Sequence, residues 1–158
     1  MWQVHGFFAY RTGSRADAEE LTQETFERAF KAWARFDPQR AALRTWLMAI
    51  ARNLLIDHFR SRVTYREVAL TEAVDSYADA QCASLGLDPA LARALALLGD
   101  REREIIALRF GGDLSGPQIA AVTGMTVANV AQILSRSLRR LRAALDADVG
   151  AADERRCE

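Results

Sequence analysis

Apolar side chains recur at three- and four-residue steps along most of the chain, and this spacing limits the fold more than any other feature. It places apolar side chains on one face of an α-helix, whereas the alternation typical of strands is almost absent. Only Pro38, Pro89 and Pro117 interrupt the pattern, and Ala, Leu, Arg and Glu are frequent. Because these four residues favour helices, the sequence predicts an all-α fold. The 158 residues, half of them hydrophobic, suffice for one ordinary domain or two small ones.

The helical pattern falls into two blocks. In the first, we expect helices over 17–36, ended by Asp37-Pro38, and over about 45–61. The pattern returns at 90, is broken at 99–100 and 111–112, and continues as helices over 116–123 and 127–147. Between the blocks, 63–89 is weakly periodic and strongly acidic, with some helix expected around 70–77. We therefore expect two small helical domains, 1–62 and 90–147, joined by a flexible acidic linker (63–89) and followed by a disordered tail (148–158).

Each main helix has an expected buried face. In the first helix it comprises Leu21, Thr25, Ala29, Ala32 and Phe36, widened by Phe26, Phe30 and Trp33; in the second, Leu47, Ile50, Ala51 and Leu54, with Leu43 leading in; in the last, Val127, Val130, Leu134, Leu138, Leu141 and Leu145. Few residues precede Arg11, so we expect Trp2, Phe7 and Phe8 to be exposed.

The net charge of zero hides a strong segregation of charge. Residues 28–66 contain nine Lys and Arg residues against Asp37 and Asp57, which leaves +7, whereas 1–27 carries −3 and 67–91 carries −5. Trp46, His58, Phe59 and Tyr65 lie within the basic block. Cations for the backbone and rings for stacking are what single-stranded nucleic acid binds, although Trp46 and Phe59 taken singly fit core positions better.

The most specific local pattern lies between residues 113 and 141. A short helix ends at Gly124, and Thr126 is placed to cap the helix that follows. The face opposite its apolar stripe carries Asn129, Gln132, Arg136, Arg139 and Arg140. Asn and Gln can read an adenine edge, and Arg can read guanine or neutralise phosphates. A helix pair with a glycine turn also occurs in many bundles, so the pattern alone leaves DNA binding and a solvated face both open.

Several other classes of function find no support in the residues. Cys82 and Cys157 lack metal-ligand or disulfide spacing, which fits the reducing cytoplasm. There is no signal peptide and no apolar run long enough to span a membrane. His5 and His58 have no Cys or Ser at a spacing typical of a catalytic site, and the sequence contains no glycine-rich phosphate-binding loop. We expect neither enzymatic activity nor a cofactor or metal.

Four sequence runs carry a resemblance to a known family. They are DAEELTQETF (17–26), FDP (36–38), LRTWL (43–47) and IARNLLIDH (50–58). They resemble region 2 of the extracytoplasmic-function (group 4, sigma-70 family) RNA polymerase sigma factors of bacteria. The helix-turn-helix, preceded by 95–110, resembles region 4 of the same family.

This resemblance implies a protein that recognises promoters and binds core RNA polymerase at the β′ clamp coiled coil and the β flap. It also implies that an anti-sigma factor binds and sequesters the protein. Matching positions for binding the β′ clamp are Glu20, Gln23, Glu24 and Glu27. Positions for opening and reading the minus-10 element are the loop 37–44, with Arg40 and Arg44, and then Arg52, Asn53, Arg60 and Arg62. Positions for the minus-35 element are Thr126, Asn129, Gln132, Ser135, Arg136 and Arg139.

Two departures from the family pattern bear on this interpretation. Ala131 and Ile133 stand where family members commonly carry cations, so either minus-35 readout depends on Asn129 and Gln132 or minus-35 binding is weak. The helix before Phe7 also looks shortened. Two other interpretations remain: a stand-alone helix-turn-helix regulator that binds duplex operators as a dimer, and a helical adaptor that binds only protein.

Overall fold

The computed structural model describes residues 2–68 and 88–154, and every regular element in these two ranges is a helix, as predicted. The first half contains α1 (Trp2–Thr12), α2 (Arg15–Lys31), the 3-10 turn η1 (Trp33–Arg35) and α3 (Leu43–Val68). The second half contains α5 (Pro89–Ala96), α6 (Asp100–Ile106), the π-helical turn η2 (Ala107–Gly111), α7 (Gly116–Thr123) and α8 (Val127–Glu154). No helix within the described ranges is both long and apolar enough to cross a bilayer.

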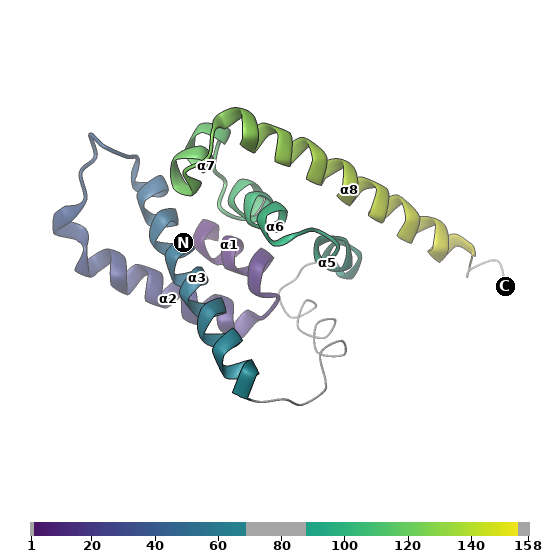
Figure 1. Ribbon diagram of the computed structural model, residues 1–158, viewed down its shortest axis with the longest axis horizontal. Helices are drawn as coiled ribbons and strands as arrows, with labels where there is room; N and C mark the ends of the chain where they lie inside the picture. Colours follow the sequence, from purple (N-terminus) through teal and green to yellow (C-terminus); the bar gives the residue numbers. More distant parts are fainter. Residues whose placement is uncertain (1, 69–87, 155–158) are drawn as a thin grey trace.

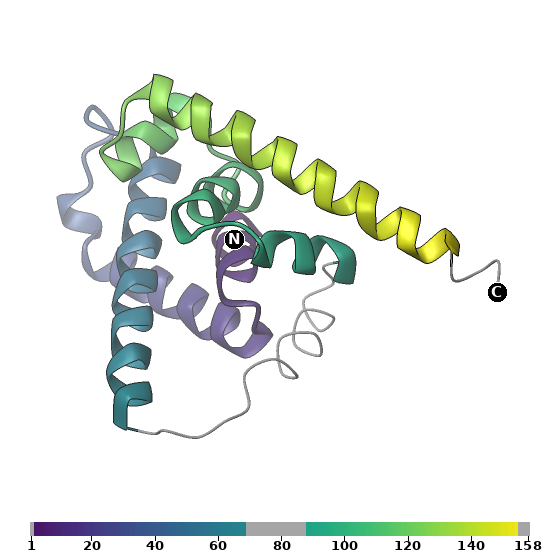
Figure 2. The same ribbon diagram turned by 45° about the vertical axis from the view of Figure 1, so that its right-hand side comes forward.

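The first helix, α1, lies at the centre of the molecule. It packs against α2 and α3 on one side and against α6 and η2 on the other (Figures 1 and 2). Phe7 and Phe8 are therefore fully buried, and the expectation that they would be exposed is wrong because it ignored the second half of the chain. Trp2 is 87% exposed, as expected.

Helix α2 begins two residues before the predicted start and ends earlier than expected. The Ser14 hydroxyl accepts a hydrogen bond from the Asp17 amide (3.3 Å), and Asp17 in the first turn suits the positive end of the helix. The helix stops at Lys31, and η1 follows it, instead of continuing to residue 36. A 3-10 turn has three residues per turn and so shifts the register. Trp33 is exposed for this reason, and Phe30, just beside the buried Ala29, is exposed as well, against the prediction for both.

Helix α3 is longer than predicted at both ends, because it contains neither proline nor glycine to stop it. Its residues 63–68 belong to the segment that we expected to be linker, whereas 69–87, including the helix expected around 70–77, lie outside the described residues. Ala51 and Leu54 are buried as predicted, but the leading Leu43 is exposed. Met48 and Leu55, which the periodicity did not select, are also buried, since the second half of the chain packs on that face.

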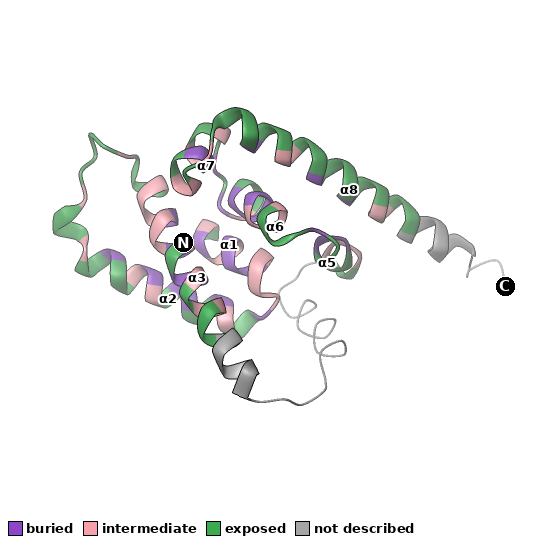
Figure 3. Ribbon diagram, viewed as in Figure 1, coloured by how far each residue is buried: buried purple, intermediate pink, exposed green. Residues whose placement is uncertain are grey.

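The last helix, α8, has 28 residues, about 42 Å of helix, and projects well beyond the rest of the molecule (Figures 1 and 2). It runs to Glu154, so part of the expected disordered tail is helical; a helix propagates at little cost once it has nucleated. Its buried positions include Val130, Ser137 and Leu141, and Figure 3 shows the rest of the helix up to residue 147 largely exposed. Val127 and Leu138 are exposed, against the prediction, because Ser137 occupies the inward position that the stripe gave to Leu138.

One hydrophobic cluster joins the two halves of the chain. It contains Phe7, Phe8 and Met48 from the first half and Leu108 and Ile119 from the second, all fully buried. A smaller cluster lies under α8, where Leu95, Leu98 and Leu141 meet Ile106. The two halves are thus packed together, an arrangement that the separate helical patterns did not predict.

Candidate nucleic-acid interface

Helices α7 and α8 form the helix-turn-helix that the sequence predicts. At the start of α7, the Ser115 amide and hydroxyl both donate to Oε1 of Gln118, at 2.8 and 3.0 Å. Gly124 ends the helix in the left-handed region, with φ of 72°, and its amide donates to the Ala120 carbonyl (2.9 Å). The Thr126 hydroxyl accepts from the Asn129 amide (3.2 Å), which confirms Thr126 as the cap of α8.

The outward face of the first turns of α8 carries the predicted base-reading side chains. Its exposed residues are Thr126, Asn129, Gln132, Ser135, Arg136 and Arg139. Arg140, predicted on the same face, remains half exposed but reaches toward α5 and α6: its guanidinium donates to the Glu102 carboxylate (2.5 Å) and to the Leu97 carbonyl (2.7 Å). Arg140 therefore braces α8 against the α5–α6 corner and is removed from the DNA-facing set.

The two positions where we noted missing cations differ in the structure. Ala131 is exposed, so a longer side chain there would reach solvent. Ile133 is half-buried and packs against the main hydrophobic cluster. Only position 131 therefore offers room for an additional contact to DNA.

In the first half of the chain, the candidate cations lie at the start of α3 and along it. Arg40 is on the loop before α3, with a side chain 87% exposed and 3.8 Å from Asp37. Asn53 and Arg60 are exposed on α3. Arg62 lies further along the same helix, beyond the residues whose side chains the structure describes.

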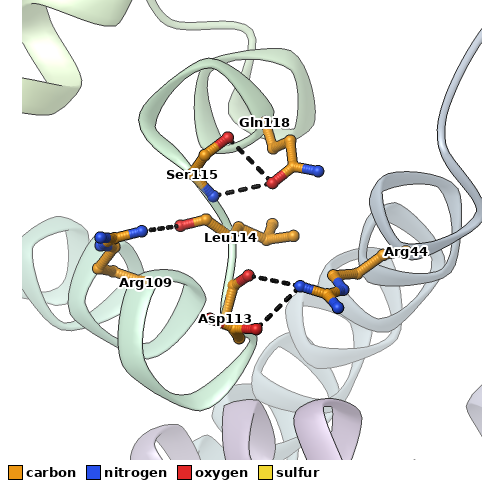
Figure 4. A network of polar contacts seen from close by, with 6 residues as sticks. All are labelled: Arg44, Arg109, Asp113, Leu114, Ser115 and Gln118. Carbon is orange, nitrogen blue, oxygen red and sulfur yellow. Dashed lines mark hydrogen bonds and ion pairs between the residues drawn. The ribbon is translucent and has the colours of Figure 1, made fainter.

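Arg44 and Arg52, by contrast, bind acidic residues of the second half. Nη1 of Arg44 donates to both the carbonyl oxygen (3.0 Å) and the carboxylate (2.9 Å) of Asp113 (Figure 4). Nε of Arg52 donates to the Glu104 carboxylate at 2.8 Å, where the two side chains are only 24% and 16% exposed. The structure thus sets Arg44 and Arg52, which are paired across the two halves, apart from the rest of the predicted set.

An aromatic cluster beside the loop 36–42 is a feature that the charge pattern did not reveal. The rings of Trp33, Phe36 and Trp46 lie together, with centroids 5.0–6.3 Å apart. Trp33 remains 56% exposed. An exposed ring of this kind can stack on a nucleic-acid base. The sequence signal was the spacing of Trp33, Phe36 and Trp46 around the proline turn. We had assigned Trp33 and Phe36 to the buried face of a continuous helix, and Trp46, taken singly, to a core position.

The predicted acidic face of α2 is present but partly neutralised within the helix. Glu20, Gln23 and Glu27 are exposed, and the Gln23 amide donates to Glu27 (3.0 Å). Glu24 accepts from Arg28 (2.7 Å), whose guanidinium also approaches Asp57 at 3.9 Å. A partner therefore meets a hydrogen-bonding surface with a net negative charge centred on Glu20 and Glu27.

The electrostatics of the second half are organised around Glu102. The Gly99 amide donates to its carboxylate (3.0 Å), and this bond, followed by the one from Arg140, lowers the Glu102 pKa. Glu102 thus caps α6 and also holds α8 against it through Arg140.

In the first half of the chain, burial lowers the pKa of Arg11, whose guanidinium donates to the Asp100 carbonyl at 3.1 Å. Within the described ranges, no three His, Cys, Asp or Glu side chains are grouped so that they could hold a metal ion.

Two family matches cover most of the chain. Residues 3–64 match Sigma-70 region 2, and residues 94–143 match Sigma-70, region 4. The first match contains α1, α2 and most of α3, and the second contains the helix-turn-helix.

Two proteins with similar sequences are both named ECF RNA polymerase sigma factors. The ECF RNA polymerase sigma factor BldN of Streptomyces coelicolor is 35% identical over 151 residues, which cover 92% of this chain and 57% of that protein. The ECF RNA polymerase sigma factor RpoE of Cereibacter sphaeroides is 32% identical over 142 residues, which cover 89% of this chain and 78% of that protein.

Solved structures with the same fold are sigma factors in complexes. The sigma factor RpoE bound to the anti-sigma factor NepR from Bartonella quintana has a TM-score of 0.71 at 25% identity, with 92% of this chain and 91% of that chain covered. CnrH in complex with the cytosolic domain of CnrY has a TM-score of 0.63 at 29% identity, with 92% and 82% covered.

Proposed function

Since the chain belongs to the extracytoplasmic-function (ECF) RNA polymerase sigma factors, we propose that it directs core RNA polymerase to promoters by reading two DNA elements with two separate surfaces. We call α1–α3 region 2 and α5–α8 region 4. Sigma factors are transcription initiation factors rather than catalysts. The observation that carries the proposal is that one chain presents a capped recognition helix, α8, and a second, basic helix, α3, with an exposed ring beside it.

Region 4 would read the minus-35 element in the major groove. The amino-terminal turns of α8 present Asn129 and Gln132 beside Thr126, in a position to bond base edges. Ser135, Arg136 and Arg139 follow one and two turns later, where a helix lying in the groove meets phosphates. Because Arg140 is bound to Glu102, we assign it no DNA contact.

Region 2 would hold the unpaired minus-10 element. The proposed contacts are Arg40, Arg44, Arg52, Asn53, Arg60 and Arg62. To contact DNA, Arg44 and Arg52 would first have to leave their ion pairs with Asp113 and Glu104, which join α3 to the second half of the chain. Trp33 would stack on a base that has left the duplex, and this contact would offset part of the cost of unstacking it, a few kcal/mol per step.

Helix α2 would dock on the β′ clamp coiled coil through Glu20, Gln23, Glu24 and Glu27, and region 4 would contact the β flap. An anti-sigma factor is the second protein partner we propose. One solved structure above holds the sigma factor RpoE with the anti-sigma factor NepR, and the other holds CnrH with the cytosolic domain of CnrY. A factor acting with RNA polymerase would work in the cytoplasm.

Binding to core polymerase tests the α2 assignment. Reversing two exposed charges, Glu20→Arg with Glu27→Arg, should weaken binding of the labelled chain to core by at least about tenfold, because like charges then face each other across the interface. Asp146→Arg at the far end of α8 is the control, and it should leave binding within about twofold, as expected of a charge outside the contact. Equal affinities for both variants would show that α2 does not make this contact.

A further inference from the structure

Glu102 is an acid that is held in place beside the recognition helix. Its side chain is only 18% exposed, and its Oε2 accepts a hydrogen bond from the Gly99 amide (3.0 Å) at the start of α6. Oε2 also accepts from Nη1 of Arg140 on α8 (2.5 Å), so both bonds end on the same oxygen. A carboxylate has two acceptor oxygens, and Oε1 of Glu102 therefore stays available to a second cation.

Two arginines of α8 lie on the side of the helix that faces Glu102. Arg136 and Arg140 are four residues apart, and residues at this spacing lie one above the other on a helix. Arg140 is bound to Glu102, whereas Arg136 remains exposed. The Gly99 bond lowers the Glu102 pKa most, the contact with Arg140 comes next, and the charge of Arg136 lowers it further. Arg136 is thus close enough for its charge to act on Glu102.

A guanidinium suits position 140 because it meets two acceptors on two elements at once. Nη1 of Arg140 donates to Glu102 in α6, and Nη2 donates to the carbonyl of Leu97, the residue that ends α5 (2.7 Å). A lysine would offer all its donors from a single nitrogen. The two bonds hold Arg140 on Glu102 and away from the outward face of α8.

Glu102 competes with DNA for Arg136, which is one of the proposed phosphate contacts of α8. A guanidinium N–H that donates to a carboxylate is not free to donate to a phosphate. Without Arg140, the partly buried carboxylate would lose its cation, and Arg136 is the cation one turn away on the same side of α8. Opposite charges attract more strongly where water is partly excluded, so Glu102 would then draw Arg136 away from the DNA.

We propose that Arg140 is a positioning residue for minus-35 binding: it occupies Glu102 and so leaves Arg136 free to bind a DNA phosphate. Arg140 acts through these two side chains and does not itself touch DNA. The inference rests on the proposed function, because a free Arg136 has a use only if α8 lies on DNA. The exchange of one arginine for the other at Glu102 is a property of the free chain and is measured without DNA.

Titration of the Glu102 carboxyl by NMR in the free full-length chain tests this exchange. Arg136→Gln should change the Glu102 pKa little when Arg140 is present, because Arg140 holds the carboxylate. In the Arg140→Ala background, Arg136→Gln should raise the Glu102 pKa by a larger amount, because Arg136 has then moved onto Glu102. Arg101→Ala removes another exposed arginine of region 4 and is the control background. There the effect of Arg136→Gln should stay as small as in wild type.

Binding of the full-length chain to a mixed-sequence DNA duplex tests the consequence for DNA, since phosphate contacts do not depend on sequence. Arg140→Ala should weaken binding by about three- to tenfold and reduce the slope of log K against log salt by about 0.9, the value for one phosphate contact. Arg101→Ala removes the same charge and should stay within about twofold of wild type. Adding Glu102→Gln to Arg140→Ala should restore affinity and slope, because the acid that captures Arg136 is gone. Arg140→Lys, which still neutralises Glu102, should retain most of the affinity.

A loss of affinity in Arg140→Ala that Glu102→Gln does not repair would overturn the inference, because Arg140 would then contact DNA itself or act only on the fold. It would also be overturned by an effect of Arg136→Gln on the Glu102 pKa that is the same with and without Arg140. The titration keeps Glu102 in place, so it decides the exchange even where Glu102→Gln lowers stability. If the exchange occurs but Arg136→Gln leaves duplex binding unchanged, the proposed function fails at this surface of α8 while the exchange stands.

Discussion

Arg52 of α3 donates from Nε to the carboxylate of Glu104 on α6 at 2.8 Å, and the pair is the least exposed ion pair that the structure shows between the two regions in its described ranges. Removing one partner should leave the other half-buried and unpaired. We expect Glu104→Ala to lower the free energy of unfolding by about 1–3 kcal/mol, the cost of stranding a hydrogen-bonded group. Chemical denaturation measures this change, and a double-mutant cycle with Arg52→Ala should give a coupling of at least about 0.5 kcal/mol. Additive effects would mean that the contact does not form in solution.

Glu102 makes the stability of region 4 depend on pH. The bonds from Gly99 and Arg140 lower its pKa from the ordinary value of 4.5, so its folded carboxylate holds its charge to lower pH than the unfolded one does. The stabilisation is complete above the unfolded pKa and is lost as pH falls through the folded pKa. We therefore expect Glu102→Gln to lower the melting temperature at pH 7 and to differ less from wild type well below pH 4.5. A difference in melting temperature between Glu102→Gln and wild type that grows on acidification would contradict this prediction.

Position 131 offers a gain of function. Because Ala131 is exposed on the recognition helix, Ala131→Arg should add a phosphate or base contact to minus-35 DNA. The slope of log K against log salt should steepen by about 0.9, the value for one additional phosphate contact. Ile133→Arg is the informative comparison, since Ile133 packs against the main cluster and its replacement should destabilise the fold. An unchanged salt slope for Ala131→Arg would show that this face of α8 does not lie on DNA.

Trp33 should act on promoter opening and not on duplex binding. We expect Trp33→Ala to weaken binding to a single-stranded minus-10 probe by about 1–3 kcal/mol, the usual value of one stacked base. Trp2→Ala removes another exposed tryptophan and should not affect probe binding. Fluorescence anisotropy with the DNA probe measures the affinity of both variants. Equal losses of affinity would show that the effect is not specific to Trp33.

The sequence predicted local structure well because the signals were local. Gly124 and Thr126 mark a helix end and a helix cap through their own backbone and hydroxyl chemistry, and both lie where the sequence placed them. The burial of Phe7, Met48 and Leu55 was not predictable in this way, because residues far along the chain cover them. Periodicity reports which face of a helix is apolar, and it does not report which distant segment packs there.

The candidate site shows the same limit. Charge and residue type indicated that Arg44, Arg52 and Arg140 belong to cationic surfaces, but not that Asp113, Glu104 and Glu102 bind them in the folded chain. Similarly, Trp33 was assigned to a core face because the 3-10 turn after α2 has no distinct sequence signal. Such pairings depend on tertiary packing, which a linear pattern does not contain.

The most direct test of the account is transcription from a randomised promoter library by core RNA polymerase with and without the purified chain. The account predicts that transcripts enriched for shared minus-35 and minus-10 sequences appear only when both chain and core are present, and that Gln132→Ala alters the minus-35 preference. Selection of duplex sites by the chain alone, with no change in the transcripts made by core polymerase, would contradict it.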